Sequence, residues 1–182
     1  MGEAPAVGPA PRRTVQDELF GSLTVTLPGE DVALARVEGP GLPTATIVRE
    51  GEARDHAQAP LGTRDAGRLT MTVGGDAAGL HLGPGRLTRS SFGVRAELPG
   101  RAYRFEPVSS HSSVLGCDGQ QVAAFVSGED ELSADWRPEE SSPSPQDAAV
   151  GYLPATAFGT GAASTGTPIV EALMGMFGVG GP

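Results

Sequence analysis

The sequence contains no lysine and no asparagine, and it has a single cysteine, Cys117. Without lysine, the chain cannot provide the phosphate-binding lysine of a P-loop, a Schiff base or an anchor for pyridoxal phosphate. One cysteine cannot form an internal disulfide bond or build a cysteine-based structural zinc site. These absences exclude the lysine-dependent enzyme classes and predict a fold held together by its own hydrophobic core. We expect no metal and no cofactor.

Positive charge is also scarce. All 13 basic residues are arginine, against 22 aspartates and glutamates, which gives a formal net charge of -9. Nucleic-acid binding depends on neutralising phosphates, and the only two basic residues in succession are Arg12 and Arg13, so we expect no nucleic-acid partner. Residues 1–11 lack the cationic and apolar regions of a secretory signal. We therefore expect a cytoplasmic protein, with a peripheral location at the membrane as the alternative.

The chain length of 182 residues fits a single domain with unstructured ends. Residues 1–13 contain three prolines and almost no large apolar side chain, which predicts a disordered tail. Residues 14–182 are predicted to form one domain. Within it, the proline- and serine-rich residues 137–147 are typical of a linker, and residues 148–179 form an apolar segment.

Between Phe20 and Trp136 apolar and polar residues alternate with a period of two, and glycine and proline interrupt the alternation. This pattern is typical of half-buried antiparallel strands joined by tight turns. The segments centre near positions 22, 33, 46, 70, 80, 88, 94, 104, 113, 123 and 134. We expect a mainly β fold, an antiparallel barrel-like domain of about ten to twelve short strands.

Two hairpins have specific turn signals. Residues 92–98 alternate between apolar residues and polar residues or glycine, and they are followed by Pro99-Gly100 and then by residues 103–106. This dipeptide favours a type II turn, because proline fixes the first φ angle and glycine adopts the positive second one. Asp118-Gly119 favours a hairpin turn of type I′ between two further strands.

The apolar segment after the linker predicts helical structure that avoids water. Residues 148–158 predict a helix that is apolar all round, begun near Ser144 or Asp147 and weakened by Pro154. A second apolar piece covers residues 169–177. A helix without a polar face lies inside protein or in lipid, and the prolines and glycines in this segment favour a buried core helix over a membrane span of about 20 residues.

The order of these elements resembles that of a known family. The residues that support this are Tyr103-Arg104-Phe105, Leu115, Asp118-Gly119, Val122-Ala123-Ala124-Phe125, Trp136, Asp147-Ala148-Ala149-Val150-Gly151-Tyr152 and Ala157-Phe158-Gly159-Thr160-Gly161. Over residues 20–175 the chain resembles uncharacterised bacterial members of the tubby-like group, which includes the LURP-one-related and phospholipid scramblase proteins. The resemblance implies a closed barrel around a C-terminal hydrophobic helix.

The resemblance also implies a binding function rather than catalysis. Tubby domains bind phosphoinositide headgroups through basic side chains on the barrel surface, and the arginines nearest to that role here are Arg86, Arg89, Arg95, Arg101 and Arg104. Ordinary solvated strand faces are the alternative explanation for them. The chain has no DxDxD spacing like the calcium-binding segment of scramblases. We expect a non-catalytic binding or scaffold protein for lipid headgroups or a protein partner, and the alternative is a protein anchored to membranes by its apolar C-terminal segment.

A third hypothesis is a hydrolase that uses His111 and four nearby serines. These serines are Ser109, Ser110, Ser112 and Ser113. No GxSxG context accompanies them, and a polar strand edge explains the same residues. His56 and His81 form no metal-binding spacing with His111. The carboxylate of Asp118 beside Cys117 disfavours a reactive thiolate, so we expect no catalytic residue.

Overall fold

The computed structural model of the chain describes residues 10–161, except residues 30, 31, 53, 58, 87, 129, 130, 138 and 140. Within the described residues, eleven strands form one sheet, and each strand pairs antiparallel with the next one in the sequence. The strands are β1 (Arg12–Asp17), β2 (Gly21–Thr26), β3 (Leu34–Glu38), β4 (Ala45–Arg49), β5 (Leu69–Val73), β6 (Asp76–Leu82), β7 (Val94–Leu98), β8 (Arg101–Pro107), β9 (Ser112–Cys117), β10 (Gln120–Ser127) and β11 (Leu132–Trp136). The described helices are α1 (Pro145–Phe158) and the short 3₁₀ helices η1 (Ala66–Arg68) and η2 (Arg89–Phe92). The predicted mainly β, antiparallel barrel-like fold is confirmed.

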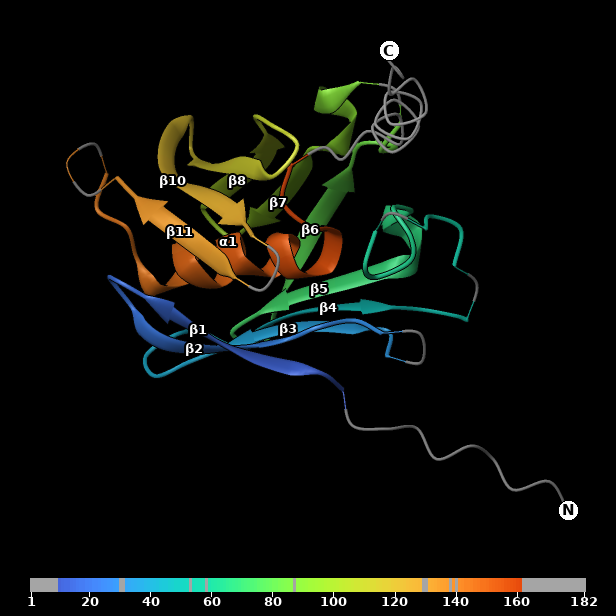
Figure 1. The fold of residues 1–182 in the computed structure, drawn as a ribbon, viewed down its shortest axis with the longest axis horizontal. Helices are drawn as coiled ribbons and strands as arrows, with labels where there is room; N and C mark the ends of the chain where they lie inside the picture. The colour runs from blue at the N-terminus through green and yellow to red at the C-terminus, as the bar shows by residue number, and fades with distance from the viewer. Residues whose placement is uncertain are drawn as a thin grey trace, which may run out of the picture.

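The connections between strands fall alternately at two ends of the barrel, because each strand runs opposite to its neighbour (Figure 1). One end, called here the tight-turn end, holds the connections 18–20, 39–44, 74–75, 99–100 and 118–119. The other end, called the loop end, holds the connections 27–33, 50–68, 83–93, 108–111 and 128–131. The long loops therefore gather at one end, and loops held by a rigid scaffold are where binding residues concentrate.

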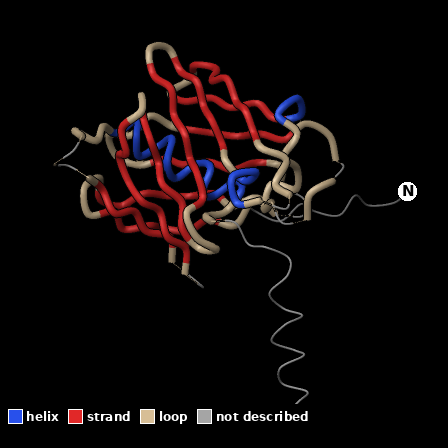
Figure 2. The backbone as a smooth tube through the Cα atoms, turned by 90° about the horizontal axis from the view of Figure 1, so that it is seen from above, coloured by secondary structure: helices blue, strands red, loops and turns tan. Residues whose placement is uncertain are grey.

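Helix α1 lies inside the curled sheet, with strands on both sides of it (Figure 2). It starts after β11 at the tight-turn end and runs back to the loop end. Every residue from Asp147 to Phe158 is buried, and the helix contacts β2, β3, β4, β5, β8 and β10. The helix therefore forms the core of the barrel, in agreement with the buried helix that its apolar composition predicted. No helix among the described residues is long and apolar enough to cross a membrane.

Helix α1 begins after Ser144, which is one of the two predicted start positions and caps the helix. The Ser144 hydroxyl accepts a hydrogen bond from the backbone N–H of Asp147 at 3.3 Å, and Oδ2 of Asp147 accepts one from the backbone N–H of Ser144 at 2.6 Å. This reciprocal capping box satisfies backbone donors that a helix leaves open at its first turn. Pro145 occupies the first helical position, where its missing N–H costs nothing. Pro154 lies within the helix, where a proline removes one backbone hydrogen bond.

The two predicted hairpins are confirmed. Leu98 pairs with Arg101 across Pro99-Gly100, and Gly100 has a φ of +76°, the positive value that a type II turn requires. Asp118 and Gly119 have φ angles of +51° and +88°. Two successive positive φ angles define the type I′ turn, whose twist matches that of the flanking strands.

Side chains close the barrel between its first and last strands, β1 and β11, which are not paired in the described sheet. Asp17, at the end of β1, is buried, and its Oδ2 accepts hydrogen bonds from Nε1 of Trp136 at 2.8 Å and from the hydroxyl of Tyr152 at 2.6 Å. Its Oδ1 accepts from the backbone N–H groups of Leu19 and Phe20. The ring of Phe20 packs edge-on against Trp136 with centroids 5.0 Å apart. One carboxylate thus connects β1, β11 and α1.

Three predicted boundaries differ from the structure. Arg12 and Arg13, assigned to the disordered tail, belong to β1, because the backbone of β1 pairs with β2 along its whole length and this ladder does not depend on apolar side chains. The segment near position 88 leads into η2 rather than a strand. The last three residues of the predicted linker 137–147 form the first turn of α1. Residues 1–9 of the predicted tail and residues 162–179 of the apolar segment lie outside the described residues.

Candidate functional site

A row of basic side chains crosses three neighbouring strands on the outer face of the barrel. His81 on β6 lies opposite Arg95 on β7, and Arg95 lies opposite Arg104 on β8. All three are exposed, since they occupy the outward positions of strands whose alternate residues face the core. The same register continues to Gly116 on β9, opposite Arg104. We call His81, Arg95 and Arg104 the basic row.

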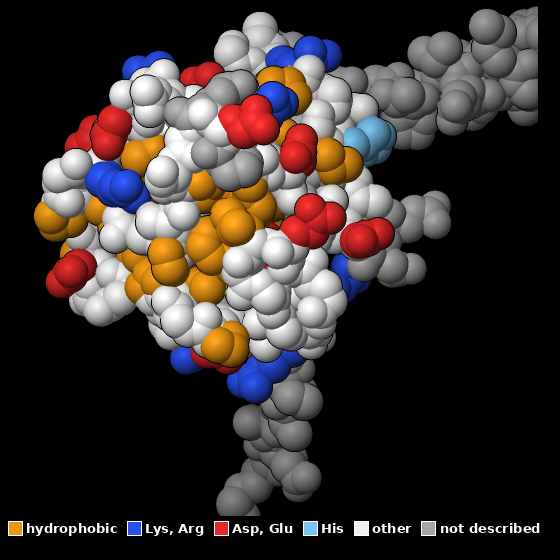
Figure 3. Space-filling view, turned by 90° about the vertical axis from the view of Figure 1, so that its left-hand side faces the viewer, with side chains coloured by type: hydrophobic (Ala, Val, Ile, Leu, Met, Phe, Trp, Pro, Cys, Tyr) orange, Lys and Arg blue, Asp and Glu red, His pale blue; other side chains and the backbone are white. Residues whose placement is uncertain are grey.

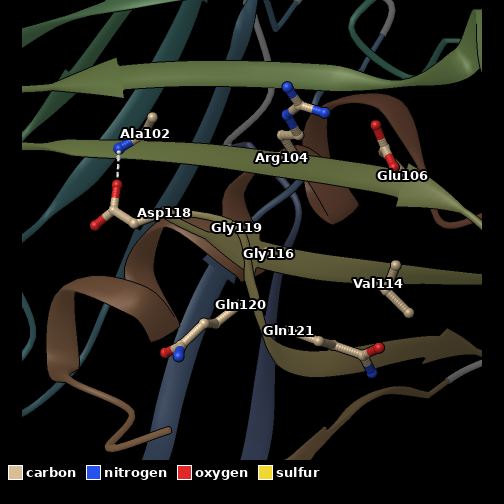
Figure 4. A pocket seen from close by; sticks show the side chains of 9 residues that line it. All are labelled: Ala102, Arg104, Glu106, Val114, Gly116, Asp118, Gly119, Gln120 and Gln121. Carbon is tan, nitrogen blue, oxygen red and sulfur yellow. Dashed lines mark hydrogen bonds between the residues drawn. The ribbon is translucent and has the colours of Figure 1, made fainter.

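A groove of about 510 Å³ lies beside the basic row, over β8, β9 and the start of β10. Its lining residues are Ala102, Arg104, Glu106, Val114, Gly116, Asp118, Gly119, Gln120 and Gln121. Figure 4 shows Arg104 and Glu106 on β8 at one side of the groove and Gln120 and Gln121 at the other. Gly116 lies between them and adds no side chain, which leaves the middle of the groove open.

Carboxylates border the basic row on both sides. Oε1 of Glu97 on β7 lies 3.8 Å from Nε2 of His81. Glu106 lines the groove and also a second hollow of about 250 Å³, which His81 and Arg95 line as well. Neither Arg95 nor Arg104 forms an ion pair with any residue that the structure describes. The surface therefore combines two arginines that have no acidic partner in the described chain with carboxylates close by.

Arg101 has a different place from the other predicted arginines, at the tight-turn end. Its Nη1 donates to Oδ1 of Asp147 at 2.7 Å, to the Ser144 hydroxyl at 3.0 Å and to the Tyr103 hydroxyl at 3.1 Å. The Tyr103 hydroxyl donates to the same Oδ1 at 2.7 Å. Negative charge at a helix N-terminus is favourable, and Arg101 neutralises this buried carboxylate. Arg101 therefore anchors the start of α1 and does not belong to the basic row.

Two residues beside Arg101, Tyr103 and Cys117, have raised pKa values. Burial raises the pKa of Tyr103, and its hydrogen bond to Asp147 raises it further. Cys117 pairs with Tyr103 across β8 and β9 and is buried. Burial raises the pKa of the Cys117 thiol to about 11, Arg101 opposes the rise, and Asp118 adds to it. Burial thus disfavours a thiolate more strongly than the adjacent carboxylate does.

Arg86 and Arg89 lie at the loop end, in the connection between β6 and β7, and not in the basic row. Nη1 of Arg89 donates to the carbonyl of Val108 at 2.8 Å. The backbone N–H of Arg86 donates to the hydroxyl of Ser91 at 2.9 Å. The five predicted arginines are thus divided among three places, and the structure brings only Arg95 and Arg104 together.

The segment around His111 receives the end of α1. Thr160 donates a hydrogen bond to the carbonyl of His111 at 2.9 Å, and the backbone N–H of Gly161 donates to the Ser113 hydroxyl at 2.8 Å. The hydroxyls of Ser109 and Ser112 bond each other at 2.6 Å. Within the described chain, no hydrogen bond joins the His111 imidazole to a serine hydroxyl. The arrangement holds the chain after the helix, and it is not the geometry of a serine nucleophile with its base.

The tight-turn end offers a different kind of surface. Figure 3 views the molecule from the left-hand side of Figure 1 and shows hydrophobic side chains across the middle of this face, with charged side chains mostly toward its edges. Leu19, in the turn between β1 and β2, is 48% exposed. Candidate sites for charged ligands therefore lie on the outer face of the sheet and at the loop end.

Sequence reasoning missed two members of the outer surface. His81 was recognised as an outward residue but not as a neighbour of Arg95, and Gly116 was not singled out. Period-two alternation indicates which side chains face outward, but only the register between strands indicates which of them are adjacent. The register of β7 and β8 could have been inferred from the two-residue turn Pro99-Gly100, which sets Arg95 opposite Arg104.

The described chain is therefore an antiparallel barrel filled by one helix, with a basic row and a groove on its outer face. Its described residues hold no group of three His, Cys, Asp or Glu side chains placed to bind a metal ion. No family model, no curated protein and no solved structure matches the chain. The tubby-like resemblance stays a prediction.

Proposed function

We propose that the protein is a non-catalytic binding module of the tubby-like kind, which binds the phosphate of a lipid headgroup on the outer face of β7 and β8. The observation that supports this proposal is the pair Arg95 and Arg104. These two exposed arginines lie directly opposite each other, and neither has an ion-pair partner in the described chain.

Like charges at directly opposite positions of two strands destabilise a sheet. A phosphate between the two guanidinium groups reverses this effect, because its oxygens accept charge-assisted hydrogen bonds from both. His81, opposite Arg95, places a third donor in the same row. The basic row thus suits an anion with several acceptor oxygens.

The charges around the basic row favour a zwitterionic headgroup over an anionic one. A protein with a formal net charge of -9 is repelled by an anionic membrane surface. Glu97 and Glu106 flank the basic row and suit a positively charged nitrogen. A headgroup that carries both a phosphate and such a cation, as phosphoethanolamine and phosphocholine do, matches both sets of charges.

Flotation of the full chain with lipid vesicles tests this proposal. We expect the protein to float with phosphatidylcholine and phosphatidylethanolamine vesicles, and to float less when phosphatidylserine is added. The double variant Arg95→Gln/Arg104→Gln should lose this binding. The matched control Arg12→Gln/Arg13→Gln removes the same two charges from exposed positions of β1 and should keep it.

A second variant changes the shape of the groove without changing its charge. A Cβ at Gly116 would lie 3.5 Å from the carbonyl oxygen of Gln120, an ordinary contact, so Gly116→Val can fill the groove without straining the strand. We expect this variant to unfold like the unmodified chain and to lose flotation. The lipid proposal is contradicted if the protein floats with neither type of vesicle, or if the arginine variant floats as well as its control. A protein partner then remains as the candidate ligand.

A further inference from the structure

A separate pocket lies at the loop end, where long connections meet the end of α1. It has a volume of about 130 Å³. Its lining residues are His56, Ala59, Pro60, Arg64, Phe92, Phe158, Gly159, Thr160 and Gly161. They come from the connection after β4, from η2 and from the end of α1, so only the folded barrel assembles them.

Arg64 is the charged residue of this pocket, and it is only 8% exposed. Its Nε donates to the carbonyl of Gly83 at 2.9 Å, and its Nη2 donates to the carbonyls of Phe92 at 2.8 Å and Gly93 at 3.1 Å. Nη1 makes no hydrogen bond to any residue that the structure describes. The rings of Phe92 and Phe158 lie 5.8 Å and 5.2 Å from the central guanidinium carbon.

All of these contacts of Arg64 are with uncharged groups. No carboxylate in the described part of the chain forms an ion pair with it. Burial lowers the pKa of Arg64 to about 10, so the guanidinium is still charged at neutral pH. A buried charge without a counter-charge is costly, and carbonyls and aromatic rings compensate only part of that cost. The pocket therefore has a cation but lacks an anion.

A second polar atom of the pocket also has no partner. Nδ1 of His56 is buried and makes no hydrogen bond to the described residues, while Nε2 lies 3.3 Å from the carbonyl of Gly85 and donates to it. His56 and Arg64 are held side by side at Gly85. A Cβ there would lie 2.8 Å from Nε2 of His56 and 2.6 Å from Cδ of Arg64. Only glycine leaves room for both side chains.

The size and the walls of the pocket limit the anion that fits. Its volume of about 130 Å³ is about a quarter of the 510 Å³ of the groove beside the basic row, so this pocket suits a smaller ligand. Four of its lining residues are apolar: Ala59, Pro60, Phe92 and Phe158. A ligand with one anionic group and a short apolar remainder matches this lining.

We propose that this pocket binds a small carboxylate such as acetate or propionate, with its carboxylate at Nη1 of Arg64 and its alkyl group against Phe92 and Phe158. Arginine is well suited to this role, because its guanidinium stays charged and the N–H groups of Nη1 can donate charge-assisted hydrogen bonds to a carboxylate. The site is independent of the basic row, since none of its lining side chains belongs to that row.

The chain's three histidines allow a direct test by nuclear magnetic resonance. His56 lies in the pocket, His81 in the basic row, and His111 beside the end of α1. Sodium acetate added to the full chain should shift the imidazole signals of His56 saturably and leave those of His81 and His111 in place. Sodium chloride at equal ionic strength should not shift them. Phosphocholine should instead shift His81, so the pocket and the proposed headgroup site are tested separately.

Two matched variants then test the role of Arg64. Arg64→Gln should weaken acetate binding by roughly tenfold or more, because it removes the charge that the carboxylate needs. Arg13→Gln removes an exposed arginine of β1, a strand that contributes no lining residue to the pocket, and should leave acetate binding unchanged. The proposal is overturned if acetate leaves the His56 signals in place or acts no differently from chloride, or if Arg64→Gln binds acetate as the unmodified chain does. The titration of the unmodified chain decides the matter even if Arg64→Gln does not fold.

Discussion

The hydroxyl of Tyr152 lies 2.6 Å from Oδ2 of Asp17, although 135 positions separate the two residues in the chain. This hydrogen bond connects α1 to the first strand, and Trp136 of the last strand donates to the same oxygen. The described strands β1 and β11 share no ladder, so the buried carboxylate takes the place of backbone pairing at the seam. The charge is tolerated because four donors surround it.

The first prediction concerns this seam. Tyr152→Phe should lower the free energy of unfolding by about 1.5–3 kcal/mol, the range for a hydrogen bond to a charged group. The fluorescence of Trp136, the only tryptophan, should report the transition in urea. Tyr103→Phe is the matched control, because it also removes a tyrosine hydroxyl from a buried carboxylate. Asp147 keeps its ion pair with Arg101, whereas Asp17 forms no ion pair with the described residues, so this variant should lose less. Equal losses for both variants would contradict a special role of the seam.

The second prediction is a loss of stability at alkaline pH. Folding raises the pKa of Tyr103 and of Tyr152 above the ordinary value of 10.0, and that of Cys117 from 9.0 to about 11. Above these ordinary values the unfolded chain releases protons that the folded chain keeps, so unfolding becomes more favourable as the pH rises. The contribution of these groups to stability should be complete below about pH 9 and decrease above it.

Ultraviolet absorbance checks this second prediction directly. Both tyrosines of the chain belong to this group, so the tyrosinate signal should appear together with the change in Trp136 fluorescence. Tyrosinate that appears while the fluorescence is still that of the folded chain would show that these hydroxyls are not protected.

The third prediction concerns the packing of α1 inside the barrel. The nearest atoms to a Cβ at Gly151 belong to the ring of Phe125, and Cδ2 of Leu115 would lie 3.1 Å away. Alanine is favoured over glycine in a helix by about 1 kcal/mol, whereas overpacking a core costs about 1–3 kcal/mol. We expect Gly151→Ala to lower the midpoint of urea unfolding. The smaller side chain in Gly151→Ala/Phe125→Leu should remove part of the clash, and strictly additive effects in this double-mutant cycle would argue against direct contact.

The fourth prediction is that the strands do not fold without the helix. Removal of residues 148–182 takes away nearly all of α1, including the fully buried Tyr152 and Leu153. The remaining chain should aggregate and lose its cooperative thermal transition, because the inner faces of the strands then have no partner. A soluble truncated chain with two-state unfolding would show instead that the segment is a separate unit, as the membrane-anchor hypothesis requires.

The elements that were predicted correctly depend on neighbouring residues. Pro99-Gly100 and Asp118-Gly119 each form the predicted turn, because the backbone preferences of these dipeptides are local. The helix was predicted because residues 148–158 lack a polar face, and Ser144 provides the cap. In contrast, β1 was missed at Arg12 and Arg13, where pairing with β2 outweighs an unfavourable composition.

The buried charges were not predicted because their partners are distant in sequence. The buried Asp17 accepts hydrogen bonds from β11 and α1, and the buried Arg64 donates to a carbonyl that follows β6. A sequence read on its own assigns both residues to solvent, since charged side chains are rarely buried without partners. The apolar Val15 between the polar Thr14 and Gln16 was one available signal that Asp17, two positions further along the strand, faces inward. The irregular connection around Arg64 contains no comparable signal.

The position of α1 after all described strands has a consequence for synthesis of the chain. The ribosome releases β1 to β11 before the helix that fills the space between them. Until α1 emerges, the apolar inner faces of the strands are therefore exposed to water or bound by a chaperone. Hairpins that form earlier have no helix to pack against. Completion of the barrel is thus coupled to translation of α1, and a chain that stalls before Pro145 becomes a target for cellular quality control.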